Sequence, residues 1–412
     1  MTVAVPGAAS NAASEQFAAG AALVAAGKMR RVLFLTHVGD PGGAEFKMID
    51  LARVMREGAE VMLLQHGSLE ASLRAQQILF SVCPMPAGAG EVRREGGFMN
   101  VLKAIPASLS MIRSVVRKGR QFDAVVCVSQ KSFVLAALAK PFMRRPILWL
   151  MNDILSPEHF SRTMIRVLVA LSRQGADHIV VNSQASLDEW VRAGGRRDRI
   201  SIIYPGMRED RVRSQLRDLG CIAFYREKYS PQPHRPLVGV FGRISRWKGQ
   251  DVFLKAIALV PGINAVIVGG AHFSEQAHER RLKELARELG VDRRVTFAGH
   301  VDEVMKVMAA CDVVAHCSTA PEPFGQVIVQ AMLAGVPVIA SDAGGAREIV
   351  VREQTGQLTP LKDHEALAAA MRRYLADPQW SREIARRAQA RAEREFSGTA
   401  MARRFLDVLG SI

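Results

Sequence analysis

Two cations, Arg243 and Lys248, stand five residues apart in the segment VGVFGRISRWKGQ. The apolar residues before them predict a buried strand, Gly242 breaks the pattern, and apolar residues at helical spacing follow Gly249. Open parallel sheets bind ligands beyond the carboxyl ends of their strands, which is where both cations fall. A planar guanidinium and a compact ammonium there can neutralise a diphosphate as the bond to it breaks. The alternative is an ordinary solvated turn.

A second segment, residues 320–350, places an acidic residue and two glycine turns close together in the chain. Glu322 and two prolines lead through Gly325 into a helical pattern, and a buried strand pattern later runs out into Gly344 and Gly345. A glycine turn that opens a helix presents unpaired N–H groups and a positive dipole end, which suits a phosphate. A carboxylate beside it can accept hydrogen bonds from hydroxyls. A site for a phosphate beside a site for sugar hydroxyls indicates that the ligand is a nucleotide sugar.

These residues resemble the motifs of the family 4 retaining nucleotide-sugar glycosyltransferases, which have the two-domain GT-B fold. The resemblance covers Arg30 to Ile412 and is most specific at G-R-x-x-x-x-K-G (242–249), E-P-F-G (322–325) and S-D-x-G-G-x-x-E (341–348). It implies a retaining hexosyltransferase that moves sugar from a UDP- or GDP-linked donor to a glycan or lipid-linked glycan. Cell-surface polysaccharide or glycolipid biosynthesis is the expected setting.

The resemblance also implies roles for individual residues. Arg243 and Lys248 would bind the donor diphosphate and Glu322 the donor sugar. Further donor contacts are expected from Gly242, His300, Phe324, Gly325, Gln326 and Val327. The family's second glutamate, eight positions after the first, holds the ribose, but here the residue is Gln330. An amide lacks the charge-assisted bidentate grip of a carboxylate, so donor binding is expected to be weaker or differently selective.

In the first half of the chain, Gly42 and Gly43 follow the first predicted strand. The family's Gly-Gly at this point approaches the donor phosphate, where a Cβ would obstruct; a simple turn is the alternative. Glu45 is expected to cap the next helix. Many members carry a His-Asp pair where this chain has Asn152 and Asp153. Asn152 can only orient the sugar, and Asp153 either holds the acceptor or stabilises the sugar cation, or caps a helix.

The remainder of the chain predicts an α/β protein with two doubly wound Rossmann-like domains and a cleft between them. We expect an N-terminal extension at 1–28, an acceptor-side domain at 29–205, a connection at 206–236 and a nucleotide-sugar domain at 237–395. A C-terminal helix, 396–412, is expected to pack back on the first domain. Strands are predicted at 32–36, 61–64, 124–128, 147–150, 178–181, 200–204, 237–241, 264–268, 295–298, 313–316 and 336–340.

Composition excludes several other classes of protein. The chain has 412 residues, 49% of them hydrophobic and 23% charged, as in ordinary globular proteins. Five cysteines without a C-x-x-C pair indicate buried free thiols in a reducing cytoplasm. No run of residues is long and apolar enough to span a bilayer. Without an Asp-x-Asp or His cluster, neither a metal nor another cofactor is expected.

Positive charge is concentrated in one part of the chain. Between residues 101 and 174 twelve Lys or Arg face three acidic residues, a net charge of +9. Residues 160–173 place Met164, Val167, Leu168 and Leu171 on one helical face and bases toward the other. This pattern fits either a core helix with solvated arginines or a helix on an anionic membrane, at the inner face of the cell membrane. Nucleic acid is not expected, because aromatics are only 6% of residues.

A second class of function stays open at this stage. Because Asn152 and Gln330 both depart from the family pattern, the protein can instead be a non-catalytic nucleotide-sugar-binding partner of another transferase. The presence of Arg243, Lys248 and Glu322 favours catalysis. A site without catalytic function would not need groups that stabilise a leaving group.

Overall fold

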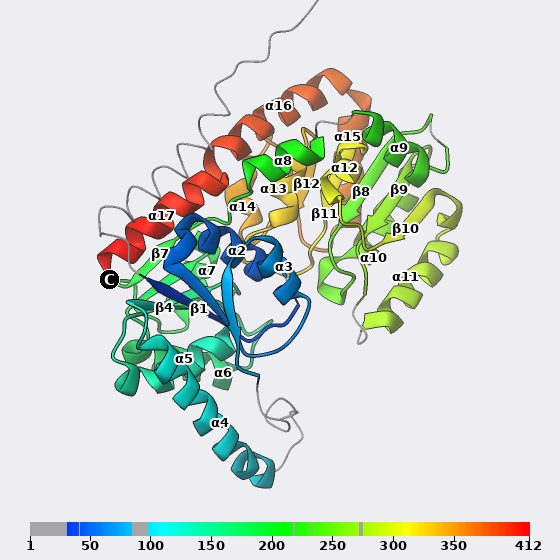
Figure 1. Ribbon diagram of the computed structural model, residues 1–412. Coiled ribbons are helices and arrows are strands. Elements are labelled where there is room, and N and C mark those ends of the chain that lie inside the picture. The colour runs from blue at the N-terminus through cyan, green and yellow to red at the C-terminus, as the bar shows by residue number, and fades with distance from the viewer. Residues whose placement is uncertain (1–30, 41, 85–97, 217–218, 233, 272–274) are drawn as a thin grey trace, which may run out of the picture. The chain divides into compact units, whose positions relative to one another are not determined.

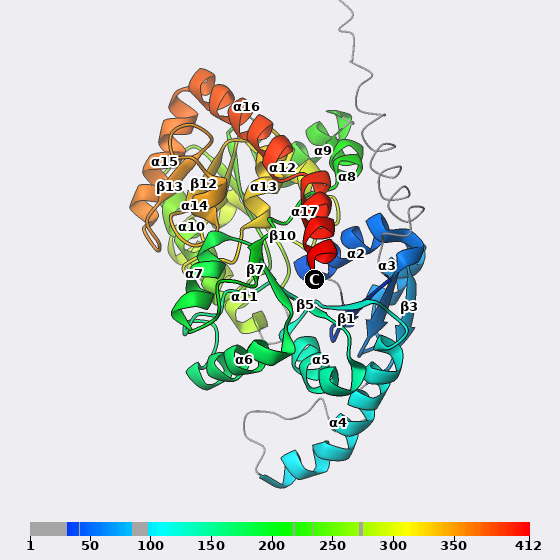
Figure 2. The same cartoon turned by 90° about the vertical axis from the view of Figure 1, so that its left-hand side faces the viewer.

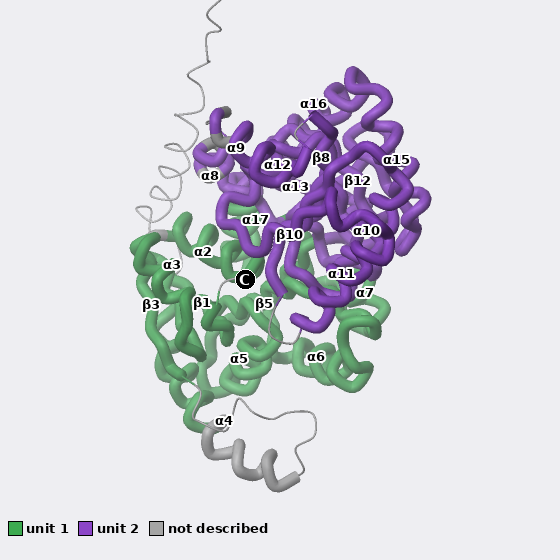
Figure 3. Tube along the Cα trace, turned by 90° about the vertical axis from the view of Figure 1, so that its right-hand side faces the viewer, with its two compact units in different colours: residues 1–182, 186–204, 401–412 green, residues 183–185, 205–400 purple. Residues whose placement is uncertain are grey.

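The computed structural model describes residues 31–40, 42–84, 98–216, 219–232, 234–271 and 275–412 (Figure 1). The predicted extension at 1–28 lies outside these residues. The chain divides into two compact units (Figure 3). Unit 1 comprises Met1–Asn182, Ser186–Tyr204 and Met401–Ile412, and unit 2 comprises Ser183–Ala185 and Pro205–Ala400. Both units alternate strands with helices, so the predicted α/β class is confirmed.

Unit 1 contains a seven-stranded sheet in the order β3-β2-β1-β4-β5-β6-β7, with every pair parallel. Its strands are β1 (Val32–Thr36), β2 (Ala59–Leu63), β3 (Leu79–Val82), β4 (Ala124–Cys127), β5 (Ile147–Met151), β6 (His178–Val181) and β7 (Ile200–Ile202). The strand order reverses between β1 and β4, which makes this the switch point where open α/β sheets bind ligands.

The helices of unit 1 cover both faces of its sheet. They are α2 (Gly43–Met55), α3 (Leu69–Ala75), α4 (Phe98–Gly119), α5 (Gln130–Met143), α6 (Arg162–Gly175), α7 (Gln184–Arg192) and α17 (Gly398–Ser411). Right-handed crossovers put α2 and α3 on one face and α4 to α7 on the other. Side chains of β1 alternate accordingly: Phe34 joins one apolar cluster and Leu35 the other.

Helix α6 corrects part of the sequence interpretation. Its buried face consists of Ile165, Leu168, Val169 and Ser172. Met164 and Val167, predicted to share a face with Leu168, are 49% and 46% exposed. The helix therefore turns two large apolar side chains to solvent beside its arginines.

Unit 2 contains a six-stranded parallel sheet in the order β10-β9-β8-β11-β12-β13. Its strands are β8 (Leu237–Phe241), β9 (Asn264–Val268), β10 (Val295–Gly299), β11 (Val313–His316), β12 (Val338–Ser341) and β13 (Gln357–Thr359). Its helices are α8 (Glu209–Leu216), α9 (Leu219–Tyr229), α10 (Gln250–Ala258), α11 (Gln276–Glu288), α12 (Val304–Ala309), α13 (Gln326–Leu333), α14 (Ala346–Ile349), α15 (His364–Ala376) and α16 (Pro378–Glu395).

The predicted strands are all present, whereas β3 and β13 were not predicted. Both are short edge strands, and neither carries the continuous run of buried residues that marks β1 or β8.

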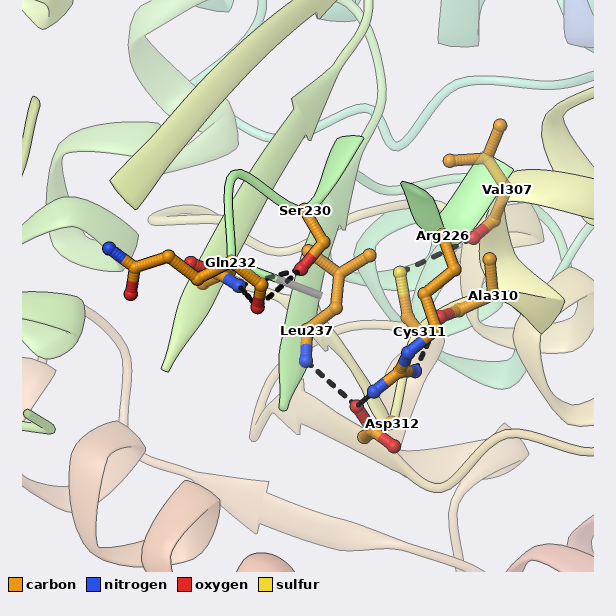
Figure 4. A network of polar contacts seen from close by, with 9 residues as sticks. Arg226, Ser230, Gln232, Leu237, Val307, Ala310, Cys311 and Asp312 are labelled. Carbon is orange, nitrogen blue, oxygen red and sulfur yellow. Dashed lines mark hydrogen bonds and ion pairs between the residues drawn. The ribbon is translucent and has the colours of Figure 1, made fainter. Parts of the chain in front are cut away.

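A network of hydrogen bonds joins the region predicted as a connection, residues 206–236, to the sheet of unit 2 (Figure 4). Arg226 on α9 donates to Ala310 O at 3.0 Å and to Asp312 Oδ2 at 2.8 Å, and Asp312 Oδ2 also accepts from the amide of Leu237 at 2.7 Å.

Candidate functional site

The first glycine-containing turn of unit 2, residues 242–249, lies against the loop that leaves β11. Gly249 has a φ of +69°, and a Cβ added there would stand 1.9 Å from the carbonyl oxygen of Cys317. The amide of Thr319 donates to Trp247 O at 2.8 Å. Only glycine allows this approach, which brings Lys248 beside the residues that follow β11.

The second glycine turn packs on the E-P-F-G loop in the same way. A Cβ on Gly344, whose φ is +58°, would lie 2.4 Å from Glu322 O, and one on Gly345 would lie 2.5 Å from Phe324 Cα. The amide of Gly345 donates to Glu322 O at 2.9 Å. The three motifs named from the sequence are therefore packed together at the carboxyl ends of β8, β11 and β12.

Glu322 is the centre of this arrangement. Its Oε1 accepts from Lys248 Nζ at 2.6 Å, from His316 Nε2 at 2.9 Å, and from the hydroxyl of Ser318. The side chain is 8% exposed. Burial raises the pKa of Glu322, but the charges and hydrogen bonds of His316 and Lys248 outweigh it, so its pKa lies well below the usual range. Glu322 is a buried carboxylate that stays ionised.

The second oxygen of this carboxylate, Oε2, has no donor among the described residues. An ionised carboxylate accepts about four hydrogen bonds, so it retains capacity for ligand hydroxyls. His316 and Ser318 were missed in the sequence interpretation. The available signal was a histidine that ends a strictly apolar strand pattern, VVAH, two residues before a serine.

Arg243 differs from Lys248 in its surroundings. It is exposed, and its guanidinium makes no ion pair or hydrogen bond with the described part of the chain, while its carbonyl oxygen accepts from Gln250 Nε2 at 3.2 Å. Lys248 is shared between Glu322 and the ring of Trp247, whose centroid lies 4.3 Å from Nζ. The guanidinium is free for a bidentate contact to a phosphate, and the ammonium is held in place.

Helix α13 begins directly after this loop. Gly325 caps it with a φ of +114°, and the amides of Gln326 and Val327 lie in the first turn, where a helix supplies no carbonyl acceptor. The side chain of Phe324 packs in the interior, edge-on to Phe396 with ring centroids 5.5 Å apart. Only the backbone of Phe324 is therefore available to a ligand.

Two further residues of the predicted donor set lie on different elements of unit 2. Gln330 lies one turn into α13, partly exposed, and its side-chain amide makes no hydrogen bond within the described residues. His300 follows β10 and is 82% exposed, 3.2 Å from Asp302. Hydrogen bonds join the ends of β8, β9 and β10: the amide of Gly242 donates to Val268 O at 2.9 Å, and the amide of Gly269 donates to Gly299 O at 2.8 Å.

Unit 1 carries the other predicted residues. Gly42 precedes α2 and Gly43 is its first residue. The amide of Gly42 donates to Glu45 Oε2 at 3.1 Å, so Glu45 caps α2 as predicted. Burial raises the pKa of Glu45, opposed by hydrogen bonds from the backbone and from Thr36.

Asn152 and Asp153 follow β5 directly. The amide nitrogen of Asn152 donates to Val128 O at 2.9 Å and Leu150 O at 3.2 Å, which leaves only its buried Oδ1 without a donor among the described residues. Asp153 does not cap a helix: the next helix, α6, is capped by Ser161, so that alternative is wrong.

The carboxylate of Asp153 instead accepts from Gln130 Nε2. Loss of hydration raises the pKa of Asp153 although the side chain is exposed, while Gln130 and His159 oppose the rise. Its charge in turn contributes to the raised pKa of Glu45, so the two carboxylates belong to one electrostatic cluster.

A buried lysine at the same edge of this sheet was missed in the sequence interpretation. Lys47 on α2 is 3% exposed and donates to Asn182 Oδ1 at 2.7 Å, and Asn182 Nδ2 donates to Asn152 O at 3.1 Å. Burial lowers the pKa of Lys47 to about 7. Nearby, His37 contacts Ser129 Oγ at 2.8 Å, and burial followed by the charge of Lys131 lowers the pKa of His37 to about 4.

The cysteines agree with the sequence interpretation where they are described. Cys127, Cys311 and Cys317 are buried free thiols, and Cys83 is a partly buried one. Burial raises the pKa of the three buried thiols. The side chain of Cys221 lies outside the described residues. Within the described chain, no helix combines the length and apolarity needed to cross a bilayer.

The protein consists of two α/β units, each built on a parallel sheet. Unit 2 carries a buried carboxylate and cations beside a helix N-terminus. This combination is typical of glycosyltransferases with the GT-B fold. Solved structures support this. Anabaena Alr3699/HepE, crystallised with UDP and glucose, has a TM-score of 0.84 and 36% identity over 93% of this chain and 100% of its own. Sucrose-phosphate synthase from Thermosynechococcus elongatus shares the fold, with a TM-score of 0.73 and 22% identity over 92% and 98% of the two chains.

Family models match both halves of the chain. Residues 41–211 match Glycosyltransferase Family 4, and residues 222–393 match Glycosyl transferases group 1. The chain belongs to this glycosyltransferase family, and the predicted GT-B fold is confirmed.

Curated relatives are similar over part of their length. The lipopolysaccharide core biosynthesis glycosyltransferase LpsE of Rhizobium meliloti is 30% identical over 50% of this chain and 58% of its own. A D-inositol 3-phosphate glycosyltransferase of Nocardia farcinica is 35% identical over 53% of this chain and 49% of its own. The chain therefore spans about half the length of the curated relatives it matches.

Proposed function

We propose that the protein is a retaining hexosyltransferase that uses a nucleoside diphosphate sugar, with UDP-glucose as the first donor to test. The observation that carries this proposal is the ionised Glu322, held by Lys248 at 2.6 Å beside the first turn of α13. The Anabaena protein, 35% identical over its full length, was crystallised with UDP-glucose. GDP-linked donors are the second choice.

In this proposal the residues of unit 2 divide the donor between them. Arg243 and Lys248 neutralise the diphosphate as it leaves, and the amides of Gln326 and Val327 bind a phosphate or sugar oxygen. The free Oε2 of Glu322 accepts from sugar hydroxyls, since Oε1 is already occupied by three donors. Gln330 contacts the ribose through its unpaired amide.

Retention of configuration is proposed to follow from departure and attack on the same face of the sugar. The leaving diphosphate then takes the proton of the acceptor hydroxyl. Asn152 cannot accept a proton, and its amide nitrogen is already used by two backbone carbonyls, so no base is assigned to it. Asp153 is proposed to position the acceptor or to stabilise the positive charge that develops on the sugar.

No metal is assigned to the reaction, because two cationic side chains supply the countercharge. Turnover should therefore persist in excess EDTA, measured after dialysis against the chelator. Loss of activity that Mg²⁺ or Mn²⁺ restores would contradict this assignment.

A glycan or lipid-linked glycan is the proposed acceptor, in cell-surface polysaccharide or glycolipid biosynthesis. LpsE, which is named for lipopolysaccharide core biosynthesis, supports this direction. The proposed location is the cytoplasm, including the inner face of the cell membrane.

The decisive experiment incubates the purified protein with UDP-, GDP- and ADP-sugars and follows nucleotide release with and without glycan acceptors. Release that depends on an acceptor, with an α-configured donor giving an α-linked product by NMR, is the expected outcome. Tight nucleotide-sugar binding without release for any donor would instead favour the non-catalytic binding partner.

A further inference from the structure

Three helices of unit 1, α4, α5 and α6, pack side by side on one face of its sheet (Figure 2). Their inner sides join one apolar core, through Met111 and Val115 of α4, Phe133 and Ala136 of α5, and Leu168 of α6. Helices with one side in a core normally place polar residues on the other.

The outer sides of these helices are not uniformly polar. Five large apolar side chains there are 46% to 63% exposed: Leu109, Leu138, Phe142, Met164 and Val167. Leu138 and Phe142 are four residues apart and Met164 and Val167 three, so each pair shares a helix face. Half of the ten large hydrophobic side chains that are exposed in the described chain lie on these three helices.

Arginines lie on the same three helices or directly after them. Eight of them form no ion pair with a carboxylate among the described residues: Arg113, Arg117, Arg120, Arg144, Arg145, Arg162, Arg166 and Arg173. Two of these guanidinium groups donate to backbone oxygens instead, that of Arg120 to Phe142 O at 2.8 Å and that of Arg145 to Arg120 O at 3.1 Å. Two lysines in the same region are neutralised, Lys118 by Glu60 at 2.6 Å and Lys140 by Asp177 at 2.7 Å. The excess charge of this part of the chain therefore stays uncompensated at its surface.

A cleft of about 750 Å³ separates the ends of α5 and α6. Leu138, Pro141 and Leu171 supply apolar walls, and Arg144 and Arg145 lie at the same opening. The cleft also includes Pro146, directly before β5, so it lies at the amino ends of the strands. Asp153 and Asn182 lie at the opposite, carboxyl ends.

We propose that the outer surface of α4, α5 and α6, called here the α4–α6 face, docks on a bilayer that contains anionic phospholipid. The exposed apolar side chains enter the boundary between headgroups and acyl chains, and the unpaired arginines contact lipid phosphates. Unpaired positive charge matches the anionic surface, and the apolar groups match the layer beneath it. This inference goes beyond the proposed transfer reaction and does not depend on its donor or acceptor.

A polyanion such as nucleic acid would use the arginines but gain nothing from exposed leucine, valine and methionine. Nucleic-acid surfaces combine basic residues with stacking aromatics, and Phe142 is the one aromatic residue among the five exposed side chains. The combination therefore favours a lipid surface, in which both kinds of side chain are used.

The first test is co-sedimentation of the full chain with vesicles of phosphatidylcholine alone or with one quarter phosphatidylglycerol. Binding should require the anionic lipid and fall in about 0.5 M salt, since the Debye length is then only a few ångströms. Arg162→Glu with Arg166→Glu should weaken partitioning about tenfold or more. Arg280→Glu with Arg287→Glu, on exposed arginines of α11 in unit 2, is the matched control and should bind normally.

The second test addresses the apolar contribution. Leu138→Ser with Phe142→Ser should weaken binding to anionic vesicles about tenfold, whereas Leu79→Ser with Leu259→Ser, at comparably exposed positions, should not. Phe142→Trp should gain fluorescence that is quenched by brominated acyl chains, and Phe224→Trp in unit 2 should not.

Several outcomes would overturn the proposal. These are equal recovery on neutral and anionic vesicles, recovery on neither, and normal binding by the Leu138 and Phe142 double variant. Equally tight binding of duplex DNA that only the arginine variant loses would identify a polyanion surface instead. None of these outcomes would bear on nucleotide release, so the proposed transferase activity is tested separately.

Discussion

At the scale of single residues, one carboxylate organises the candidate donor site. Glu322 Oε1 accepts hydrogen bonds from Lys248, His316 and Ser318, so the carboxylate stays ionised although it is buried. A buried charge is tolerated only when it is paired and hydrogen-bonded. The same contacts hold the ammonium of Lys248 in one position before any ligand arrives, which is the preorganisation that electrostatic catalysis requires.

Lys248→Ala should lower kcat about a hundredfold or more while the protein stays folded, because one preorganised charge is removed from the leaving diphosphate. Steady-state kinetics with the preferred donor measure the loss, and circular dichroism verifies the fold. Lys255→Ala is the matched control, since that lysine is partly exposed and its ammonium lies 4.0 Å from the carboxylate of Asp251. A folded Lys248→Ala protein with normal turnover would remove this lysine from the mechanism.

Gln330→Glu should retain activity and tighten nucleotide binding, because a carboxylate makes stronger bonds to two ribose hydroxyls than an amide does. The unpaired state of the Gln330 side chain in the described structure means that no internal partner is lost. Calorimetric titration of UDP into both proteins measures the change. Substantially weaker binding by the variant would mean that another group holds the ribose.

Lys47 predicts a pH dependence of stability in unit 1. Its pKa is about 7 in the folded protein against 10.5 for the unfolded chain, so the unfolded state binds more protons between these values. Stability should therefore rise with pH over this range, by up to about 1.4 kcal/mol per pH unit. Lys47→Met should abolish this rise in stability. The midpoint of urea unfolding, measured at pH 7, 8 and 9, should then no longer increase with pH through this group.

Lys131→Met, at an exposed lysine, is the control for Lys47→Met and should leave the slope unchanged. A wild-type slope that persists in Lys47→Met would assign the proton release to another group.

At the scale of elements, glycines determine how the loops of unit 2 pack. Gly249, Gly344 and Gly345 let three loops approach backbone to backbone, closer than any Cβ allows. The motifs are far apart in sequence, yet each is placed by a turn at the carboxyl end of a strand. The candidate donor-binding groups are thus positioned by turns that are fixed to the ends of strands.

Gly249→Ala should damage both stability and activity. A Cβ there would stand 1.9 Å from Cys317 O, so the turn that carries Lys248 must move. Gly262→Ala is the matched control, because Gly262 also has a positive φ, +82°, but has no heavy atom within 4 Å of the added Cβ.

The control isolates the backbone cost of a positive φ, about 1–2 kcal/mol. Thermal unfolding and donor turnover of both variants make the comparison. Equal effects would mean that the loop after β11 adjusts without displacing Lys248.

At the scale of the whole molecule, the chain returns to unit 1 after unit 2 is complete. Met401, Phe405 and Leu409 of α17 join the core that also contains Phe34, whose ring centroid lies 6.1 Å from that of Phe405. The last twelve residues therefore complete the core of unit 1, although about 200 residues of unit 2 precede them.

Phe405→Ala should destabilise unit 1 by about 3–5 kcal/mol, the usual cost of removing a buried aromatic ring. Hydrogen exchange should show the loss at the amides of β1, while those of β8 in unit 2 keep their protection. Arg403→Ala, at an exposed position of the same helix, should change neither. Unchanged protection of β1 in Phe405→Ala would mean that α17 contributes little to that core.

Local patterns in the sequence were sufficient to predict the class of fold and the motifs of the candidate donor site. Buried parallel strands are continuous apolar runs, so strands such as β1 and β8 can be recognised from a few adjacent residues. The positions of Arg243, Lys248, Glu322 and Gln330 followed from spacing and from resemblance to a family. The short strands β3 and β13 were not predicted. Each lies at the edge of its sheet and pairs with one neighbouring strand, so it does not need a continuous run of apolar residues.

Contacts between side chains that are distant in sequence could be identified only from the folded structure. His316 and Ser318 meet Glu322, and Lys47 meets Asn182 far along the chain, because strand ends distant in sequence share one edge of a sheet. Periodicity also could not decide whether Met164 and Val167 face the core. A helix carries its apolar residues at the same spacing whether they pack inward or face solvent, and only the neighbouring helices determine which side is covered.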